Sequence, residues 1–337
     1  MSSNIEKDYE AKHLANIQKA QKKIKAAYKD VINKIYLQAR SLKPKGKVFR
    51  ITDYPVFSKY VDKLLLEFRD KFGTTVVNGI NGQWQMATEK NAAVIHKLYD
   101  QSKIIDQVTR KIYDPQAAAL EGFVNRKIAG LDLSDRVWKY TNQFRTEIEQ
   151  NLYAGIQEGK SAAAMARDQL QYLENPSQLF RRVRDAEGTL QLSEAAKAYH
   201  PGQGVYRSSY KNAMRLTRTT INDAYRSSDM VRYQTLPFIL SYNVNLSNNH
   251  PKTDFCDDLQ GVYPVTFVWT SWHVQCLCYC TSNLASPKEF ERYQEAILNG
   301  TADKFKFSQV EELPDQFNSY VKKRKVQWIN GKGSRIG

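Results

Sequence analysis

The sequence has 337 residues, of which 50 are Lys or Arg and 35 are Asp or Glu, so its formal net charge is +15. The length predicts about two domains, and a hydrophobic fraction of 42% excludes a wholly disordered chain. The excess of positive charge favours a polyanionic partner such as nucleic acid, but it does not indicate sequence-specific binding.

The sequence contains no segment typical of a membrane or secreted protein. Residues 1–12 are charged and lack the apolar core of a signal peptide, and no later stretch approaches the roughly 18 apolar residues that span a bilayer. We therefore expect a soluble protein that is not exported by the ordinary secretory route.

The first predicted element is a long amphipathic helix from Ile5 to Leu42. Its apolar residues recur at three- and four-residue steps. They are Ile17, Ala20, Ile24, Tyr28, Val31 and Ile35. The first 50 residues hold thirteen Lys or Arg against four acidic residues, a local excess of +9. This basic face is either an ordinary solvated helix face or a surface that contacts DNA.

The candidate nucleic-acid-binding residues lie at the two ends of the chain. Phosphate contacts need clustered cationic side chains. The candidates are Lys19, Lys22, Lys23, Lys322, Lys323, Arg324 and Lys325.

Helical spacing continues through most of the amino-terminal half. A second helix is predicted to end near Gly73, and a turn containing Gly and Asn follows around Asn78–Gly82. Helical spacing resumes at Val94–Ile112 and at Val137–Ile156. About the first 155 residues are therefore predicted to be helical throughout.

Strands appear only in the second half of the sequence. Arg181–Arg184 and Thr189–Leu192 flank the turn-forming Glu187-Gly188 and predict a small hairpin. A helix is predicted at Tyr210–Thr235 and a strand at Phe238–Leu246, and a charged helical tail follows residue 285. The expected fold class is α+β and mainly α-helical.

All four cysteines lie between residues 256 and 280, whereas a disulfide-stapled secreted domain spreads them along the chain. Reduced thiols in a cytoplasm are therefore expected. The segment His-x-x-Cys-x-Cys offers three ligands for tetrahedral zinc, and a further Cys offers the fourth. The candidate metal ligands are Cys256, His273, Cys276 and Cys278. The alternative is that these are buried, reduced cysteines supporting a short irregular hairpin.

A Cys/His nucleophilic pair, with Asp254 or Asp257 orienting the His, is a further alternative. Phosphate-binding Gly-x-x-x-x-Gly-Lys-Ser/Thr, His-Glu-x-x-His and Gly-x-Ser-x-Gly patterns do not occur in the sequence. A nucleotide-driven motor or a common hydrolase is therefore disfavoured.

The helix at Tyr210–Thr235 carries polar residues at three- and four-residue steps, which form one stripe. They are Arg215, Arg218, Asn222, Tyr225, Arg226 and Asp229. The stripe is either a functional surface or a network of Arg and Asp that fastens this helix to the cysteine loop.

A series of motifs in residues 202–229, 247–264 and 272–278 carries a family resemblance. The positions are Gly202, Val205, Tyr206, Arg207, Ser208, Lys211, Arg215, Arg218, Asn222, Tyr225, Arg226, Asp229, Ser247, His250, Asp254, Cys256, Gly261, Tyr263, Pro264, Trp272, His273, Cys276 and Cys278. The series resembles the Mu F-like phage head morphogenesis family, the minor head proteins of tailed bacteriophages. Its motifs fall in the family order.

The chain departs from the family pattern at a few positions. Family members usually carry Glu at the position of Thr220, and close relatives carry Cys at the position of Thr253. Pro and Arg are often found where this chain has Val274 and Leu277. These departures bear on a carboxylate opposite the arginine stripe and on zinc binding, while the implied fold is unaffected.

The resemblance covers about residues 140 to 285 and implies a mixed α/β Mu F-like domain with a Cys/His-containing loop at 141–285. Helical spacing predicts a helical region at 1–140 before it and a basic helical tail at 286–337 after it. The resemblance also implies that Arg215 to Asp229 of the stripe, together with Asp254 and Gly261, form the structural motif of the domain.

The implied function is that of a minor capsid protein at the portal vertex, which acts in head assembly and in DNA packaging or ejection. Its implied partners are the portal protein, other capsid proteins and packaged double-stranded DNA. The implied location is the virion, or the host cytoplasm during assembly, with no enzymatic activity. The alternatives are a sequence-nonspecific nucleic-acid-binding protein and a Cys/His-dependent enzyme.

Overall fold

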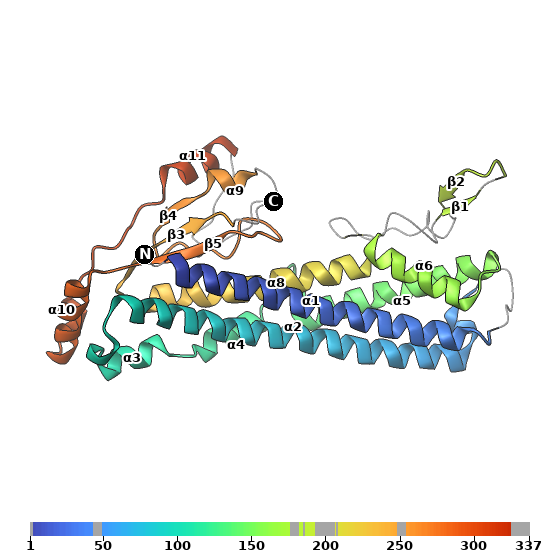
Figure 1. Ribbon diagram of the computed structural model, residues 1–337, viewed down its shortest axis with the longest axis horizontal. Helices are drawn as coiled ribbons and strands as arrows, with labels where there is room; N and C mark the ends of the chain where they lie inside the picture. The colour runs from blue at the N-terminus through green and yellow to red at the C-terminus, as the bar shows by residue number, and fades with distance from the viewer. Residues whose placement is uncertain are drawn as a thin grey trace. The chain divides into compact units, whose positions relative to one another are not determined.

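The computed structural model describes residues 3–42, 49–175, 182–184, 186–192, 206, 208–247 and 254–324. Figure 1 shows the order of its elements. The α-helices are α1 (Ser3–Ala39), α2 (Pro55–Leu98), α3 (Asp106–Ile112), α4 (Ala117–Val124), α5 (Leu133–Gln157), α6 (Ala162–Glu174), α8 (Ser209–Thr235), α9 (Phe255–Asp258), α10 (Pro287–Leu298) and α11 (Asp315–Arg324). Short 3-10 helices are η1 (Ile51–Asp53), η2 (Gln101–Lys103) and η3 (Ala302–Lys304).

The strands are few and short. They are β1 (Arg182–Arg184), β2 (Leu190–Leu192), β3 (Ile239–Asn245), β4 (Gly261–Tyr263) and β5 (Tyr279–Leu284). The fold is mainly α-helical with a small antiparallel sheet, as the sequence predicts. The predicted hairpin is the antiparallel pair β1–β2, and the predicted strand after α8 is β3.

The chain divides into two compact units, and both are discontinuous in sequence. The first unit is Met1–Ile17, Asn78–Val124 and Arg218–Gly337, and the second is Gln18–Val77 and Asn125–Thr217. Three long helices, α1, α2 and α8, contribute residues to both units. The predicted division at residues 140 and 285 concerns the extent of a family resemblance, so it stays a prediction.

The predicted break in the second helix is wrong, because α2 runs without interruption from Pro55 to Leu98. Gly73 and Gly82 lie inside it, where a helical Gly is less favourable than Ala but tolerated. Gly79 has a packing role, since a Cβ at this position would clash with the Cδ1 of Ile221. The glycine therefore permits close contact with α8 in the first unit.

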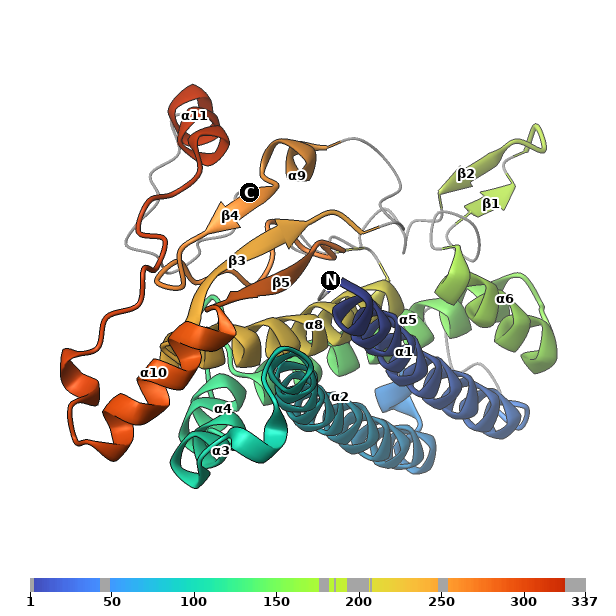
Figure 2. The ribbon, with the colours of Figure 1, turned by 60° about the vertical axis from the view of Figure 1, so that its left-hand side comes forward.

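The three-stranded sheet of the first unit has the order β4–β3–β5, and both pairings are antiparallel. Figure 2 shows this sheet lying over α8. Tyr242 in the central strand is opposite Tyr263 of β4 and Ser282 of β5. Both neighbours of β3 come from the cysteine region, so the pairing brings this region onto α8.

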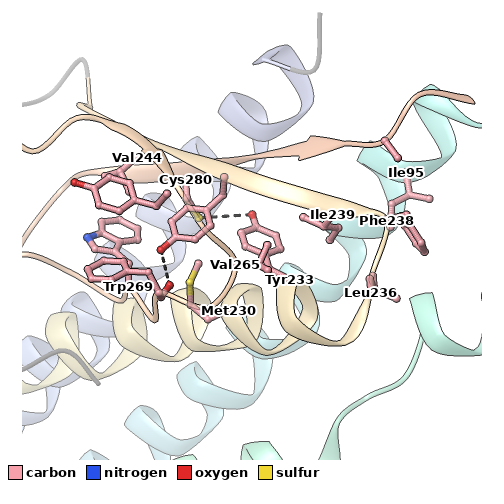
Figure 3. Close-up of a cluster of buried hydrophobic side chains, with 14 of the residues drawn as sticks. Ile95, Met230, Tyr233, Leu236, Phe238, Ile239, Val244, Val265, Trp269 and Cys280 are labelled. Carbon is pink, nitrogen blue, oxygen red and sulfur yellow. Dashed lines mark hydrogen bonds between the residues drawn. The ribbon is translucent and has the colours of Figure 1, made fainter. Parts of the chain in front are cut away.

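The core of the first unit lies between the sheet and α8. Figure 3 shows Met230 and Tyr233 of α8 facing Val244 and Cys280 of the sheet. All four cysteines belong to this cluster of buried residues. Burial of such side chains stabilises by about 1.5–3 kcal/mol each for the large aliphatic and aromatic ones.

The predicted helical tail after residue 285 is present as α10 and α11. Ser286 caps α10, its hydroxyl accepting from the N–H of Glu289. Phe317 of α11 packs against Tyr263, and its ring also contacts the ring of Trp272. The tail is therefore part of the aromatic core that surrounds the cysteines.

The second unit is held together by aromatic packing between helices. Tyr28 of α1 contacts Phe68 of α2 edge to face and Phe144 of α5, with ring centroids 4.5 Å apart in both pairs. Asp132 caps α5 in a capping box with Asp135, so the predicted helix at Val137–Ile156 begins one turn earlier, at Leu133.

Among the described residues, none of the helices combines the length and the apolar character needed to span a membrane.

Candidate functional site

The candidate site is built from α9 and from the loop before β5. Asp254 caps the short helix α9, accepting from the N–H of Cys256, and forms a capping box with Asp257. On the loop, the N–H of Cys276 donates to the carbonyl of His273 and closes a turn. Gln275 within that turn has a φ of +66°, in the left-handed region that non-glycine residues rarely adopt. These two local structures turn the cysteines inward.

Three of the four cysteines converge. The sulfur atoms of Cys256, Cys276 and Cys278 all lie within 4.8 Å of one another, and the three side chains are buried. All four cysteines of the chain are free thiols. The structure therefore brings together three of the four metal ligands predicted from the sequence.

Hydrogen bonds within the cysteine trio, Cys256, Cys276 and Cys278, concentrate negative charge on one sulfur. Cys276 accepts from the thiols of Cys256 and Cys278, and also from the backbone N–H groups of Trp272 and Cys278. These donors lower the pKa of Cys276 well below its ordinary value, and the same sharing raises the pKa of Cys256. Cys276 is thus the main hydrogen-bond acceptor of the trio.

His273 lies beside the cysteine trio. Its Nδ1 is 2.9 Å from the carbonyl oxygen of Val274, an acceptor that fixes the proton on Nδ1. Its Nε2 is 3.5 Å from Oδ2 of Asp254, and these two groups and Cys256 all lie within 4.8 Å of one another. Cys256 is therefore shared between two groups of potential metal ligands.

Cys280, the fourth cysteine, has a different environment. Its thiol donates to Asp229 of α8 at 3.5 Å, and the hydroxyl of Tyr233 is 3.6 Å from its sulfur (Figure 3). Burial and the negative charge of Asp229 raise the pKa of Cys280 to about 12. This side chain is a neutral member of the core.

The polar stripe of α8 provides two buried charges to the first unit. Arg226 donates to both carboxylate oxygens of Glu10, at 2.7 and 2.8 Å, and to the carbonyl of Cys278 at 3.1 Å. Asp229 accepts from Lys90 at 2.6 Å and from the amide of Asn91 at 2.8 Å. The link between this helix and the cysteine loop is therefore direct, through Arg226.

The other residues of the predicted motif have several different positions. Asn222 and Tyr225 are buried in the first unit, where the ring of Tyr225 stacks on His13 with centroids 4.2 Å apart. Arg218 interacts electrostatically with Cys276, while Arg215 belongs to the second unit and lies over the ring of Tyr206. The six residues of the stripe therefore do not form one site.

Gly261, at the start of β4, has a φ of +155°, a backbone conformation that L-residues rarely adopt. A Cβ at this position would also meet the side chain of Gln316, which donates to the carbonyl of Gln260. The glycine is therefore required by the local backbone where α11 approaches β4.

Three polar residues of α1, which were not predicted from the sequence, complete this network. Glu6 accepts from the N–H of Ser282 in β5, Glu10 pairs with Arg226, and His13 contacts Gln83 and Asn222. All three side chains are buried. Their spacing could have revealed them, because positions 6, 10 and 13 continue the apolar stripe that passes through Ile17.

The candidate nucleic-acid-binding lysines are exposed where the structure describes them. Lys19, Lys22 and Lys23 lie on the open face of α1, and Lys322 and Lys323 lie at the end of α11. The side chain of Arg324 and the whole of Lys325 are outside the described residues. Exposure is compatible with phosphate contacts but equally with a solvated face.

The arrangement of the site favours ligation over catalysis. A thiol nucleophile works from a partly exposed position, whereas Cys256 is buried and has a raised pKa. Three converging sulfurs offer soft ligands, and the imidazole of His273 lies within 4.8 Å of one of them, Cys256. Metal binding by these residues stays a prediction, beside the alternative of buried, reduced thiols.

Comparison of the chain with family models, with curated proteins and with solved structures gave no match. The resemblance to the Mu F-like family therefore rests on the motif series alone.

Proposed function

We propose that this chain is a structural minor head protein of a tailed bacteriophage, associated with the portal vertex and acting in head assembly. The ordered motif series is the basis of the proposal. Further support comes from where the motif residues lie: Arg226, Asp229 and Cys256 are buried in one framework in the first unit. A family signature of this kind preserves a fold, as a structural protein requires.

The proposed protein partners are the portal protein and other capsid proteins. The long helices α1 and α2 offer extended exposed faces for such contacts. We expect co-expression with the portal protein to give a complex that co-purifies.

The second proposed partner is packaged double-stranded DNA, bound without sequence preference. A net charge of +15 inside a DNA-filled shell would place a polyanion next to the protein. The exposed lysines of α1 and α11 are the groups that would contact phosphate. Such contacts would assist packaging or ejection.

Mass spectrometry of purified particles tests the proposal. The expected result is a virion that contains this protein at far fewer copies than the major capsid protein, with assembly beginning in the host cytoplasm. Particles that lack the protein would exclude a virion component and leave a transient assembly factor or a nucleic-acid-binding protein outside the virion. A gene beside those of portal, terminase and major capsid proteins is also expected.

The enzyme alternative has a separate test. The buried thiol of Cys256 supports a non-enzymatic role, because a reactive cysteine needs an exposed, stabilised thiolate. Turnover by the purified protein that is abolished in Cys256→Ala, with the fold retained, would favour the enzyme instead.

A further inference from the structure

We propose that Cys256, Cys276, Cys278 and His273 bind one zinc ion, which acts as a structural tie between α9 and the loop before β5. The inference goes beyond the proposed function, because a metal centre in this part of the chain is independent of any role in a phage head. It rests on the three converging sulfurs and on the position of His273 beside one of them, Cys256.

The first observation is that three sulfur atoms converge. A disulfide joins only two, so a group of three favours ligation of a metal ion. Tetrahedral zinc with Zn–S bonds of about 2.3 Å holds its sulfur ligands about 3.8 Å apart. The three sulfurs here are within 4.8 Å of one another, so small side-chain movements are sufficient to reach that geometry. Their burial excludes bulk water from the site.

The second observation is the set of donors directed at Cys276. Its sulfur accepts from the backbone N–H groups of Trp272 and Cys278. Amide donors stabilise negative charge on sulfur, and the thiolate is the form of Cys that binds metal. The loop holds these donors by a turn with a non-glycine residue, Gln275, at positive φ. Such local strain persists only where the surrounding structure imposes it.

The third observation identifies the fourth ligand. Nδ1 of His273 donates to the carbonyl of Val274 at 2.9 Å, so in the neutral ring the lone pair is on Nε2. That Nε2 atom is buried and makes no hydrogen bond, and its neighbours within 4.8 Å are the sulfur of Cys256 and Oδ2 of Asp254, 3.5 Å away. This is the usual arrangement of a metal-binding histidine, in which the second nitrogen is oriented by a backbone carbonyl.

Asp254 is the competing fourth ligand, since it lies in the same group as Cys256 and His273. Its carboxylate is already engaged as the cap of α9, where Oδ1 accepts from the N–H of Cys256 at 2.7 Å. Zinc in structural sites prefers sulfur and imidazole ligands. Asp254 therefore orients Cys256, and His273 completes the coordination.

The charges around the site suit a divalent soft ion. Three thiolates and Zn²⁺ sum to one formal negative charge, and the guanidinium of Arg218 interacts electrostatically with Cys276. Arg226 donates to the carbonyl of Cys278 and adds positive charge to the same loop. Thiolate and imidazole ligands discriminate against magnesium and calcium, which prefer oxygen.

The test uses the full-length protein, purified without chelator. Elemental analysis should find about one zinc per chain, the stoichiometry of a four-ligand structural site. Replacing zinc with Co²⁺ should produce a sulfur-to-cobalt charge-transfer band, whose intensity rises with the number of thiolate ligands. Removing zinc with a chelator should lower the thermal unfolding midpoint, because metal binding is linked to folding.

Four variants assign the ligands. Cys276→Ser should lose zinc, whereas Cys280→Ser is the matched control: it removes an equally buried thiol outside the site and should retain zinc. His273→Gln should keep the fold and the charge-transfer band but weaken zinc binding by at least about 10-fold, since even outer-shell changes cost that much. Asp254→Asn should retain about one zinc per chain.

Three outcomes would overturn the inference. A folded protein that contains no zinc and takes up neither Zn²⁺ nor Co²⁺ would leave the cysteines as buried thiols. A disulfide between any two of the trio would do the same. Loss of zinc in Asp254→Asn, with zinc retained in His273→Gln, would show that the fourth ligand is Asp254. If Cys276→Ser fails to fold, the His273 and Asp254 variants still decide.

Discussion

At the scale of the residue, the most consequential group is the carboxylate of Asp229, which is fully buried between Lys90 and Asn91. Asp229→Asn would leave the ammonium of Lys90 buried without its counter-charge. We expect a loss of about 3–5 kcal/mol in the free energy of unfolding, the range for breaking a buried ion pair. Chemical denaturation with an unchanged m-value would measure it.

Asp70→Asn provides the control, because Asp70 pairs with Arg69 on an exposed surface. A solvent-exposed ion pair contributes about 0–1 kcal/mol. Equal, small effects of the two substitutions would mean that Lys90 finds another partner, and the buried pair would then not be the source of stability.

The same residue shows what sequence could and could not supply. Spacing along α8 predicted that Asp229 and Arg226 share a face, and it left open whether that face is a surface or a network. The partners Lys90 and Glu10 come from positions more than 130 residues away in the chain. Local spacing carries no information on such pairings, whereas burial of the charges follows directly from the folded structure.

At the scale of the element, α2 remains a continuous helix although it contains Gly73, Gly79 and Gly82, the glycines from which an end and a turn were predicted. Gly79→Ala should destabilise the first unit, because its Cβ would clash with Ile221. We expect a cost of about 1–3 kcal/mol, typical of overpacking. Gly82→Ala, three residues on and with open space around it, should stabilise by up to about 1 kcal/mol. Thermal unfolding of both variants would compare them.

The free energy of unfolding is therefore expected to fall in Gly79→Ala and to rise in Gly82→Ala. If both glycines tolerate Ala equally, close packing does not explain Gly79, and the run from Asn78 to Gly82 would be a weak point in α2. The sequence pattern could not separate the two glycines, since only the neighbouring helix distinguishes them.

The beginning of α1 is held by buried polar groups, and burial shifts the pKa of one of them, His13. Burial lowers the pKa of His13 below its ordinary value, so the folded protein binds its proton less readily than the unfolded chain does. Below about pH 6.5 the unfolded chain is protonated at this position. Stability from His13 is therefore present above that pH and lost as the pH falls towards the lower, folded pKa.

The expected outcome is a pH dependence that one substitution reduces. The free energy of unfolding should fall between neutral pH and pH 5, by at most about 1.4 kcal/mol per pH unit for one proton. His13→Gln should flatten this slope, whatever its effect on absolute stability. His96→Gln is the control, since His96 is partly exposed and the burial that also lowers its pKa is less complete. A slope unchanged by His13→Gln would contradict the assignment.

At the scale of the whole molecule, the units interleave in sequence, and this explains which parts of the architecture could be predicted. Helical periodicity predicted α1, α5 and α8 to within a few residues, because each buries a regular apolar stripe. The strands β4 and β5 were not predicted. Each pairs with β3, and pairing over such separations depends on tertiary contacts that local patterns do not encode.

Only part of the candidate site could be predicted, because local sequence patterns do not encode tertiary contacts. Four candidate ligands, three Cys and one His, lie within 23 residues, and this clustering predicted either a metal site or a group of buried thiols. The approach of Phe317 to the aromatic core beside the cysteines could not be predicted, because the tail showed only charge and helical spacing.

DNA binding by the basic face of α1 can be tested without disturbing the fold. Because α1 supplies buried residues to both units, deleting it would remove core packing along with charge. The sharper change is Lys19→Gln, Lys22→Gln and Lys23→Gln together, which leaves the buried face intact. If these lysines bind phosphate, the slope of log Kobs against log salt should become shallower by about 0.9 for each phosphate no longer neutralised, with little dependence on DNA sequence.

A matched triple variant on α2, Lys59→Gln, Lys63→Gln and Lys71→Gln, removes the same charge from other exposed positions and should change the slope less. Equal slopes in the two variants would mean that DNA senses only net charge. In that case the basic face of α1 is a solvated surface and not a binding site.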